Sequence, residues 1–146
     1  MKKVFCDNWL AKALLCMSSC HTITVGPFVL SKRAEEKITQ EVRNHECTHA
    51  RQWVEMAVVS GALIWWLVLL SGLSAWWMAL SPLAFYLWYG IEWIVRSLIY
   101  SVAGPGGERK SAYRMVSFEQ EAYGNEADPN YLENSDYFAW VDYLSK

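Results

Sequence analysis

The chain has 146 residues, which suits one domain rather than two. The net charge is only -2 and no basic patch carries interleaved aromatic side chains, so the composition argues against nucleic-acid binding. Because no convincing signal peptide precedes them, we interpret Cys6, Cys16, Cys20 and Cys47 as reduced thiols. A second metal site built from the first three with His21 has no familiar spacing.

The N-terminal part is predicted to contain a short helix and a β element. Apolar residues recur at helical spacing between Trp9 and Met17, which indicates an amphipathic helix. Residues 21–25 alternate β-branched side chains, which predicts a strand, and residues 28–30 continue it or form a second strand after Gly26-Pro27. Such a strand could hold an extended peptide by strand addition or be a structural clip, and the sequence favours neither.

A long helix is predicted next. Ser31 is a candidate N-cap, and neither Gly nor Pro occurs from Ser31 to Ser60. Apolar residues and histidines follow at helical spacing, so we expect one helix to run directly into an apolar segment.

Residues 45–49 of this helix read His-Glu-x-x-His. Two histidines four positions apart lie about 40° from each other on one helix face, so His45 and His49 can reach one zinc ion. Glu46 can address a water molecule on that ion without being a ligand, which makes it the expected general base. Cys47 falls on the opposite face and is expected to pack rather than bind metal. The alternative is an ordinary amphipathic helix with two surface histidines.

The apolar segment predicts a membrane hairpin. No Asp, Glu, Lys, Arg or His occurs from Met56 to Ile91, and most of the nine tryptophans lie in or beside this run. Its length suits two short spans, at about 1.5 Å per residue and about 30 Å of hydrocarbon. A soluble bundle with a buried hairpin, or a hairpin lying in the membrane interface, is the alternative.

The turn and the second span follow from Gly and Pro. Gly72 predicts a tight turn, and the second span is expected from about Ala75 to Tyr100 with a kink at Pro82. Lys and Arg flank both ends of the hairpin and are absent from its tip, so the positive-inside rule places the zinc site on the cytoplasmic side. Glu92 and Arg96 are expected to form a salt bridge at the membrane boundary, the alternative being that Glu92 lies near substrate.

The C-terminal part is predicted to be helical and polar. Residues 103–107 read as a linker, residues 113–123 as a helix, residues 130–133 as a capping box and residues 135–144 as a short closing helix. The whole is therefore expected to be one mainly α membrane domain, divided into residues 20–55, 56–100 and 108–146.

A catalytic zinc ion needs a third protein ligand. No histidine follows His49, so this ligand should be a carboxylate. Glu119 and Glu121 are the candidates, and Glu126 is a weaker one. Two carboxylates on one helix turn would allow one to bind the metal and the other to orient a histidine.

The segments around residues 45–49 and 117–122, separated by an apolar hairpin, resemble the integral-membrane gluzincin peptidases. These include the CAAX prenyl protease and HtpX heat-shock protease group, and the region around His45 is also similar to the β-lactam sensor-transducer peptidases and to short bacterial membrane proteins of unknown function. In that group a Glu-x-x-Ala-Asp segment supplies the third ligand, which the resemblance places at Glu119. Tyr123 stands where that segment has Asp.

The resemblance implies a zinc metallopeptidase that hydrolyses a peptide or membrane-protein substrate at the cytoplasmic membrane face. It also implies that the membrane is a bacterial inner membrane. An oxyanion donor would come from Tyr113, Arg114, Tyr123 or His21. Because a short chain leaves little room for a substrate groove, a second copy or a partner subunit could complete the site. The alternative function is a non-hydrolytic zinc-binding membrane module that binds a partner or supports assembly.

Overall fold

The computed structural model describes residues 3–102 and 109–145, so the expected linker at residues 103–107 lies outside the described residues. The described chain is mainly helical with one small sheet, as predicted. Its elements, in chain order, are β1 (Val4–Phe5), α1 (Trp9–Leu14), β2 (Thr22–Val25), β3 (Phe28–Ser31), the 3-10 helix η1 (Glu35–Lys37), α2 (Gln40–Ser71), the 3-10 helix η2 (Ala75–Leu83), α3 (Ala84–Val102), α4 (Arg109–Arg114), α5 (Ser117–Asn125), α6 (Tyr131–Asn134) and the 3-10 helix η3 (Ala139–Tyr143).

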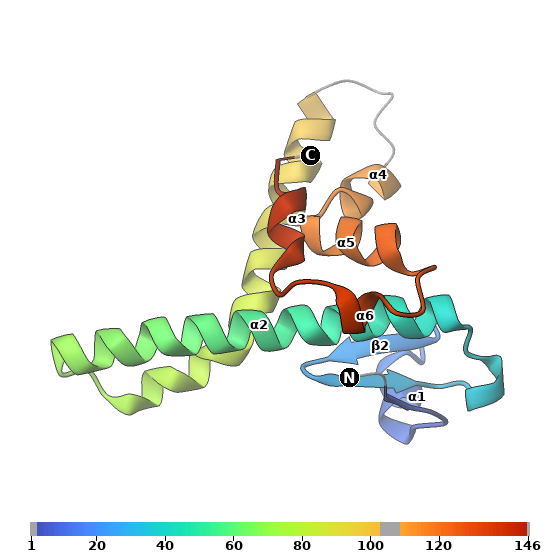
Figure 1. The fold of residues 1–146 in the computed structure, drawn as a ribbon, viewed down its shortest axis with the longest axis horizontal. Helices are drawn as coiled ribbons and strands as arrows, with labels where there is room; N and C mark the ends of the chain where they lie inside the picture. Colours follow the sequence, from blue (N-terminus) through green and yellow to red (C-terminus); the bar gives the residue numbers. More distant parts are fainter. Residues whose placement is uncertain (1–2, 103–108, 146) are drawn as a thin grey trace.

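The three strands form a sheet in the order β1-β3-β2. The strands β2 and β3 are antiparallel and are joined by a turn in which Gly26 adopts φ +60°, a left-handed conformation that glycine takes without strain. The strand β1 pairs with β3 in parallel. This order leaves β2 at an edge of the sheet, where it lies along the first half of α2 (Figure 1).

The prediction that the long helix begins after Ser31 is wrong. Ser31 is the last residue of β3 and is fully buried; its hydroxyl donates to the His21 carbonyl and accepts from the Arg33 N–H. The helix α2 begins at Gln40, and the Thr39 side chain caps it by accepting from the Val42 N–H. Because β3 pairs with a strand on each side, Ser31 stays in the sheet. The residues between β3 and α2 therefore do not join the long helix, although their helix propensity favours it.

The predicted turn at Gly72 is confirmed, since α2 ends there with Gly72 at φ +67°. The following segment η2 packs back along α2, and α3 then turns away from it (Figure 1). The expected kink at Pro82 therefore takes the form of a 3-10 segment that becomes α-helical at Ala84, because proline lacks an N–H and clashes with the preceding turn. Trp53 holds the bend to α2 by donating to the Pro82 carbonyl at 2.9 Å.

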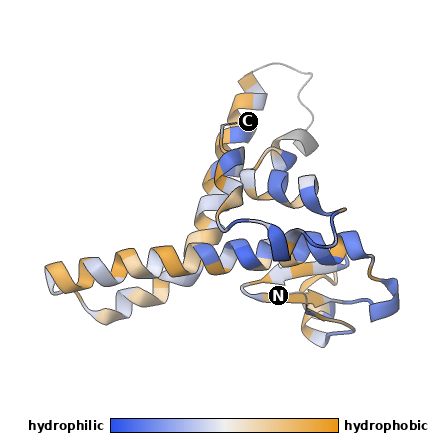
Figure 2. Cartoon of the chain, viewed as in Figure 1, coloured by the Kyte–Doolittle hydropathy of each residue, from blue (hydrophilic) through white to orange (hydrophobic). Residues whose placement is uncertain are grey.

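Two helical stretches, Gln40–Ser71 and Ala75–Val102, are long and apolar enough to cross a membrane, with mean hydropathies of 1.9 and 1.2 over their most apolar windows. Figure 2 shows hydrophobic residues along the far half of α2, along η2 and along α3, whereas the near half of α2 and the C-terminal helices are hydrophilic. Only 11% and 6% of those windows are buried within the chain. A core helix of a soluble protein would be mostly covered, and exposed apolar surfaces of this kind are typical of sites that contact a membrane or another protein.

The C-terminal helices pack onto α2 and α3 around Phe118. Its ring lies 4.7 Å from the rings of Phe85 and Trp140, and it is fully buried. Glu92 of α3 caps the start of α5, where it accepts from the Ser117 N–H at 2.9 Å and from the Ser117 hydroxyl at 2.7 Å. The predicted pair of Glu92 with Arg96 is also present, at 3.5 Å.

One prediction for the last segment is wrong. The Asn130 side chain does not cap α6, so residues 130–133 form no capping box. The predicted closing helix is present, but it is a 3-10 helix and spans only Ala139 to Tyr143. Phe138, just before it, has a left-handed backbone at φ +62°, and Trp140 within it is buried.

Candidate metal centre

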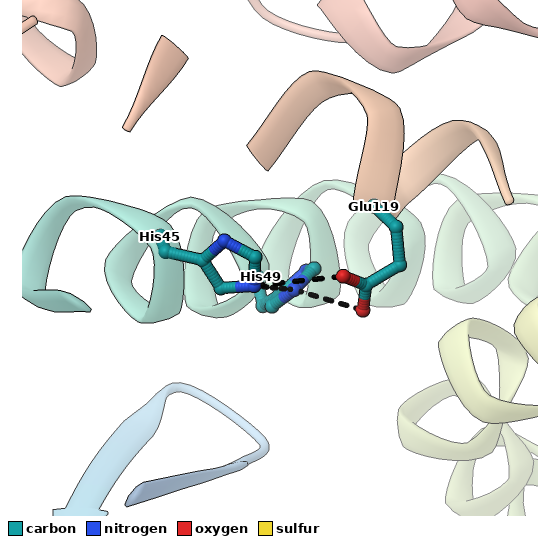
Figure 3. Close-up of side chains that lie close together, drawn as sticks. All are labelled: His45, His49 and Glu119. Carbon is teal, nitrogen blue, oxygen red and sulfur yellow. Dashed lines mark hydrogen bonds and ion pairs between the residues drawn. The ribbon is translucent and has the colours of Figure 1, made fainter. Parts of the chain in front are cut away.

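His45 and His49 of α2 meet Glu119 of α5 (Figure 3). The two Nε2 atoms are 3.2 Å apart. The Glu119 carboxylate lies 3.2 Å from His49 Nε2 through Oε1 and 3.5 Å from His45 Nε2 through Oε2. The fold thus brings together all three residues named as metal ligands from the sequence, and the cluster can hold a metal ion.

The outer nitrogen of each imidazole has its own partner. His45 Nδ1 lies 3.1 Å from Glu126 Oε2, and a carboxylate can only accept, so His45 carries its proton on Nδ1. His49 Nδ1 lies 2.8 Å from Gln52 Oε1. The amide group of Gln52 is oriented by its Nε2, which donates to the Phe118 carbonyl and to Glu121. His49 therefore also donates through Nδ1, and both Nε2 atoms are left as acceptors.

Two nitrogen lone pairs and a carboxylate then face one point. Such a set repels itself unless a cation lies between its members. Glu119 is only 2% exposed, and its Oε2 atom makes no hydrogen bond in the described part of the chain. Burial by itself would raise the pKa of Glu119, but without a metal ion a proton at either Nε2 atom is donated to its carboxylate, and these contacts with His45 and His49 hold that pKa well below its usual range. The buried donor set, with one oxygen free of hydrogen bonds, fits a metal ion.

Glu121, the other candidate ligand, points to a different group of residues. Its carboxylate accepts from Arg51 at 2.8 Å, from Gln52 at 2.8 Å and from the Tyr131 hydroxyl at 2.9 Å. It therefore reaches His49 only through Gln52, as a residue that orients the imidazole. Glu126 contacts His45 Nδ1 directly and orients that imidazole.

Glu46 is fixed by the edge strand. The Thr24 hydroxyl lies 2.6 Å from Glu46 Oε2 and 3.1 Å from the Glu46 backbone oxygen. Glu46 is half-buried and lines the same cavity as both histidines. A carboxylate held by a hydroxyl and facing a cavity beside a metal-ligand cluster is placed to exchange a proton with a molecule bound there.

Two cavities meet at this point. One, of about 360 Å³, lies between β2, α2 and α3 and reaches His49 and Glu119. The other, of about 320 Å³, extends from His45 and Glu46 toward the start of α2. Tyr113 lines both, whereas Tyr123 and His21 line only the second. The ring of Tyr123 packs on His45 at 4.5 Å and is covered by Arg114 at 4.4 Å, which leaves Tyr113 as the oxyanion candidate that faces both cavities.

The cysteines do not join the cluster of metal ligands, although Cys20 lines both cavities. Cys47 is buried in a small core with Val4, Val29 and Ala50, as its helical position predicted. Cys16 and Cys20 are exposed free thiols, and within residues 3–102 and 109–145 the metal-ligand groups that converge are those of His45, His49 and Glu119.

Four residues that position the site were not singled out from the sequence for that purpose. Gln52 is three residues after His49 and on the same helix face, a spacing that could have indicated it. The other three residues come from elements that are distant in the sequence. Tyr89 donates to Glu119 Oε1 at 2.9 Å, Thr24 positions Glu46, and Glu92 positions α5. No local sequence pattern indicates contacts of this kind.

Comparisons with protein-family models, with curated proteins and with solved structures returned no match for this chain.

Replacing Gln52 by alanine should weaken metal binding by about 10–100-fold, because His49 loses the acceptor that fixes its tautomer. The variant should also unfold more easily in chelator, since Glu121 and the Phe118 carbonyl lose a buried donor, at a cost of about 1–3 kcal/mol. Competition with a chromogenic chelator measures the first effect and thermal unfolding the second. Unchanged affinity would show that Gln52 does not orient His49.

Proposed function

We propose that this protein is a zinc-dependent, membrane-embedded peptidase. Two histidines and a glutamate bind the metal, and Glu46 acts as the general base. The observation that carries the proposal is the convergence of His45, His49 and Glu119 at one point, beside the anchored carboxylate of Glu46 in a cavity.

Zinc is favoured by the kind of ligands. The two histidine Nε2 atoms are 3.2 Å apart, and each lies 3.2 or 3.5 Å from a different oxygen of the Glu119 carboxylate, so the three side chains are close enough to share one metal ion. The same residue types also bind non-haem iron. Two histidines and one glutamate also leave a coordination position open, which a catalytic site requires.

The chemistry divides between the metal and the chain. A bound zinc ion supplies a Lewis acid that activates water and polarises a carbonyl group. Glu46 takes a proton from the attacking water as the C–O bond forms, and donates it to the leaving amine nitrogen as the C–N bond breaks. The Thr24 hydrogen bond keeps the Glu46 carboxylate aimed into the cavity throughout. Tyr113 lines the same cavity and is the residue whose hydroxyl would stabilise the developing oxyanion.

The edge strand supports a peptide as the substrate. The strand β2 pairs with β3 on one side, and residues 22–24 line the cavity that contains the metal ligands. An extended chain laid along the other side of β2 would place a peptide bond beside the cluster, and main-chain hydrogen bonds would hold it without requiring one particular side chain.

The exposed apolar surfaces support a membrane location. The apolar part of α2, from Met56 to Ser71, is about 24 Å long at 1.5 Å per residue, which covers most of a hydrocarbon layer of about 30 Å. Lys and Arg occur in the sequence before and after the apolar hairpin and not at its tip, and Figure 2 shows hydrophilic residues on the near half of α2 and on the C-terminal helices, so in the proposed arrangement this side faces the cytoplasm of a bacterial cell.

We expect the protein to stay in the membrane pellet when membranes are washed with carbonate at high pH, since its apolar windows have no cover within the chain. Immunoblotting of pellet and supernatant measures this, with a peripheral membrane protein of the same cells as the control for release. Recovery in the supernatant would contradict a spanning hairpin and favour one that lies in the interface.

The test of the proposed activity is hydrolysis of unfolded casein by the purified protein in detergent, after loading with zinc. Activity should disappear in chelator and return with zinc. A protein that binds zinc but cleaves neither casein nor short peptides would instead be a non-hydrolytic zinc-binding module.

A further inference from the structure

The two cavities beside the metal cluster form one groove with unlike halves. They share Thr22, His45, Glu46 and Tyr113 as common walls, so the cluster lies where the halves meet. The strand β2 runs along this groove at the edge of the sheet. An extended chain bound to β2 would therefore pass from one half to the other.

One half is aromatic. Phe85, Tyr86 and Tyr89 line it, and all three belong to α3, one of the helices apolar enough to cross a membrane. The Tyr86 hydroxyl accepts from the Gly26 N–H at 2.7 Å, which ties this wall to the end of β2. The aromatic half thus lies at the Val25 end of the strand and suits apolar side chains.

The other half is basic. Arg33 and Lys37 line it, both are exposed, and neither side chain forms an ion pair within residues 3–102 and 109–145. Two carboxylates, those of Glu46 and Glu126, also line this half, but both are partly buried, against Thr24 and His45 respectively. The basic half lies at the Thr22 end of β2, and the exposed charges there are those of Arg33 and Lys37.

We propose that the groove selects peptides whose apolar residues precede the scissile bond and whose acidic residues follow it, an inference that rests on the peptidase function. Antiparallel strand pairing is the more stable and more common arrangement. A peptide antiparallel to β2 has its N-terminal residues at the Val25 end, against the aromatic wall, and its C-terminal residues at the Thr22 end, against Arg33 and Lys37. A chain that leaves a membrane and continues into an acidic segment has this order.

Measuring peptide binding to a variant that cannot hydrolyse tests this selectivity independently of catalysis. The probes are three fluorescein-labelled ten-residue peptides, measured by anisotropy with the zinc-loaded Glu46→Gln variant, which keeps the groove. The first has an apolar half of Leu, Phe and Ala followed by an acidic half of Asp, Glu and Ala. The second has the halves exchanged, and the third carries Asn and Gln in place of the acids.

We expect the first peptide to bind about five- to tenfold more tightly than the other two, as two exposed charge pairs allow, with the difference shrinking in high salt. The double variant Arg33→Glu, Lys37→Glu should lose this preference. Lys12→Glu, which reverses an exposed cation paired with Asp7 outside the groove, should keep it.

Equal affinities, tighter binding of the exchanged peptide, or a preference that survives the double charge reversal would overturn the inference. The parent protein, tested on the same peptides by mass spectrometry of the products, reports on the activity separately. A binding preference without cleavage would overturn the proposed peptidase and leave a groove that sorts peptides. Cleavage without preference would keep the peptidase and remove the selectivity.

Discussion

Replacing Glu119 by glutamine is expected to reduce the zinc content of the purified protein from about one ion per chain to nearly none. The substitution preserves shape but exchanges a charged carboxylate for a neutral amide at a proposed site for which the described part of the chain offers three ligands. Elemental analysis after gel filtration measures the content. Retention of zinc at the parent level would show that Glu119 is not a ligand.

The effect of zinc on the free energy of unfolding should distinguish a metal ligand from a residue with only a structural role. Zinc at about a thousand times its dissociation constant should stabilise the parent by about 4 kcal/mol, and the Glu119→Gln variant should gain little. In chelator the variant should lose only the stability that the charge of Glu119 gains from His45 and His49, as the lowered pKa of Glu119 implies.

Glu121→Gln is the matched control, two residues along the same helix. It disturbs the buried contacts with Arg51, Gln52 and Tyr131, so it should lower stability both with and without zinc. It should still bind zinc, with affinity reduced through the orientation of His49. Loss of zinc from both variants in equal measure would mean that α5 as a whole, rather than Glu119, determines metal binding.

Replacing Glu46 by glutamine should abolish hydrolysis while the metal stays bound. A glutamine can still accept the hydrogen bond from Thr24, but it cannot take a proton from water, so kcat should fall by about 10²–10⁴-fold. Casein or peptide hydrolysis measures the rate, and zinc content confirms that the site is intact.

The Thr24→Val variant provides a comparison for this result. It keeps the Glu46 carboxylate but removes the hydroxyl that positions it, so we expect a smaller loss of kcat than in Glu46→Gln. Turnover that is unchanged in Glu46→Gln would exclude this residue as the general base. The remaining reading would then be a zinc-binding module that acts through a partner or in assembly.

The sequence by itself determined the ligand pair. Residues four apart on a helix share a face whatever surrounds them, so His45 and His49 had to converge once α2 formed, and Cys47 had to face away. The apolar run from Met56 to Ile91 and the glycine at position 72 likewise determined where two apolar helical stretches would lie, because their signals are local.

Only the tertiary structure decided the rest of the site. The packing of α5 on α2 placed Glu119 beside the histidines, whereas Glu121 contacts Arg51 and Gln52. Both carboxylates belong to one helix turn, so spacing alone allowed either of them to be the ligand. Strand pairing kept Ser31 in β3, so α2 starts later than the sequence predicts. The bend at Pro82 directs the chain so that α3 forms part of the cavity wall. These outcomes depend on contacts between residues far apart in the chain, and local propensity carries no information about such contacts.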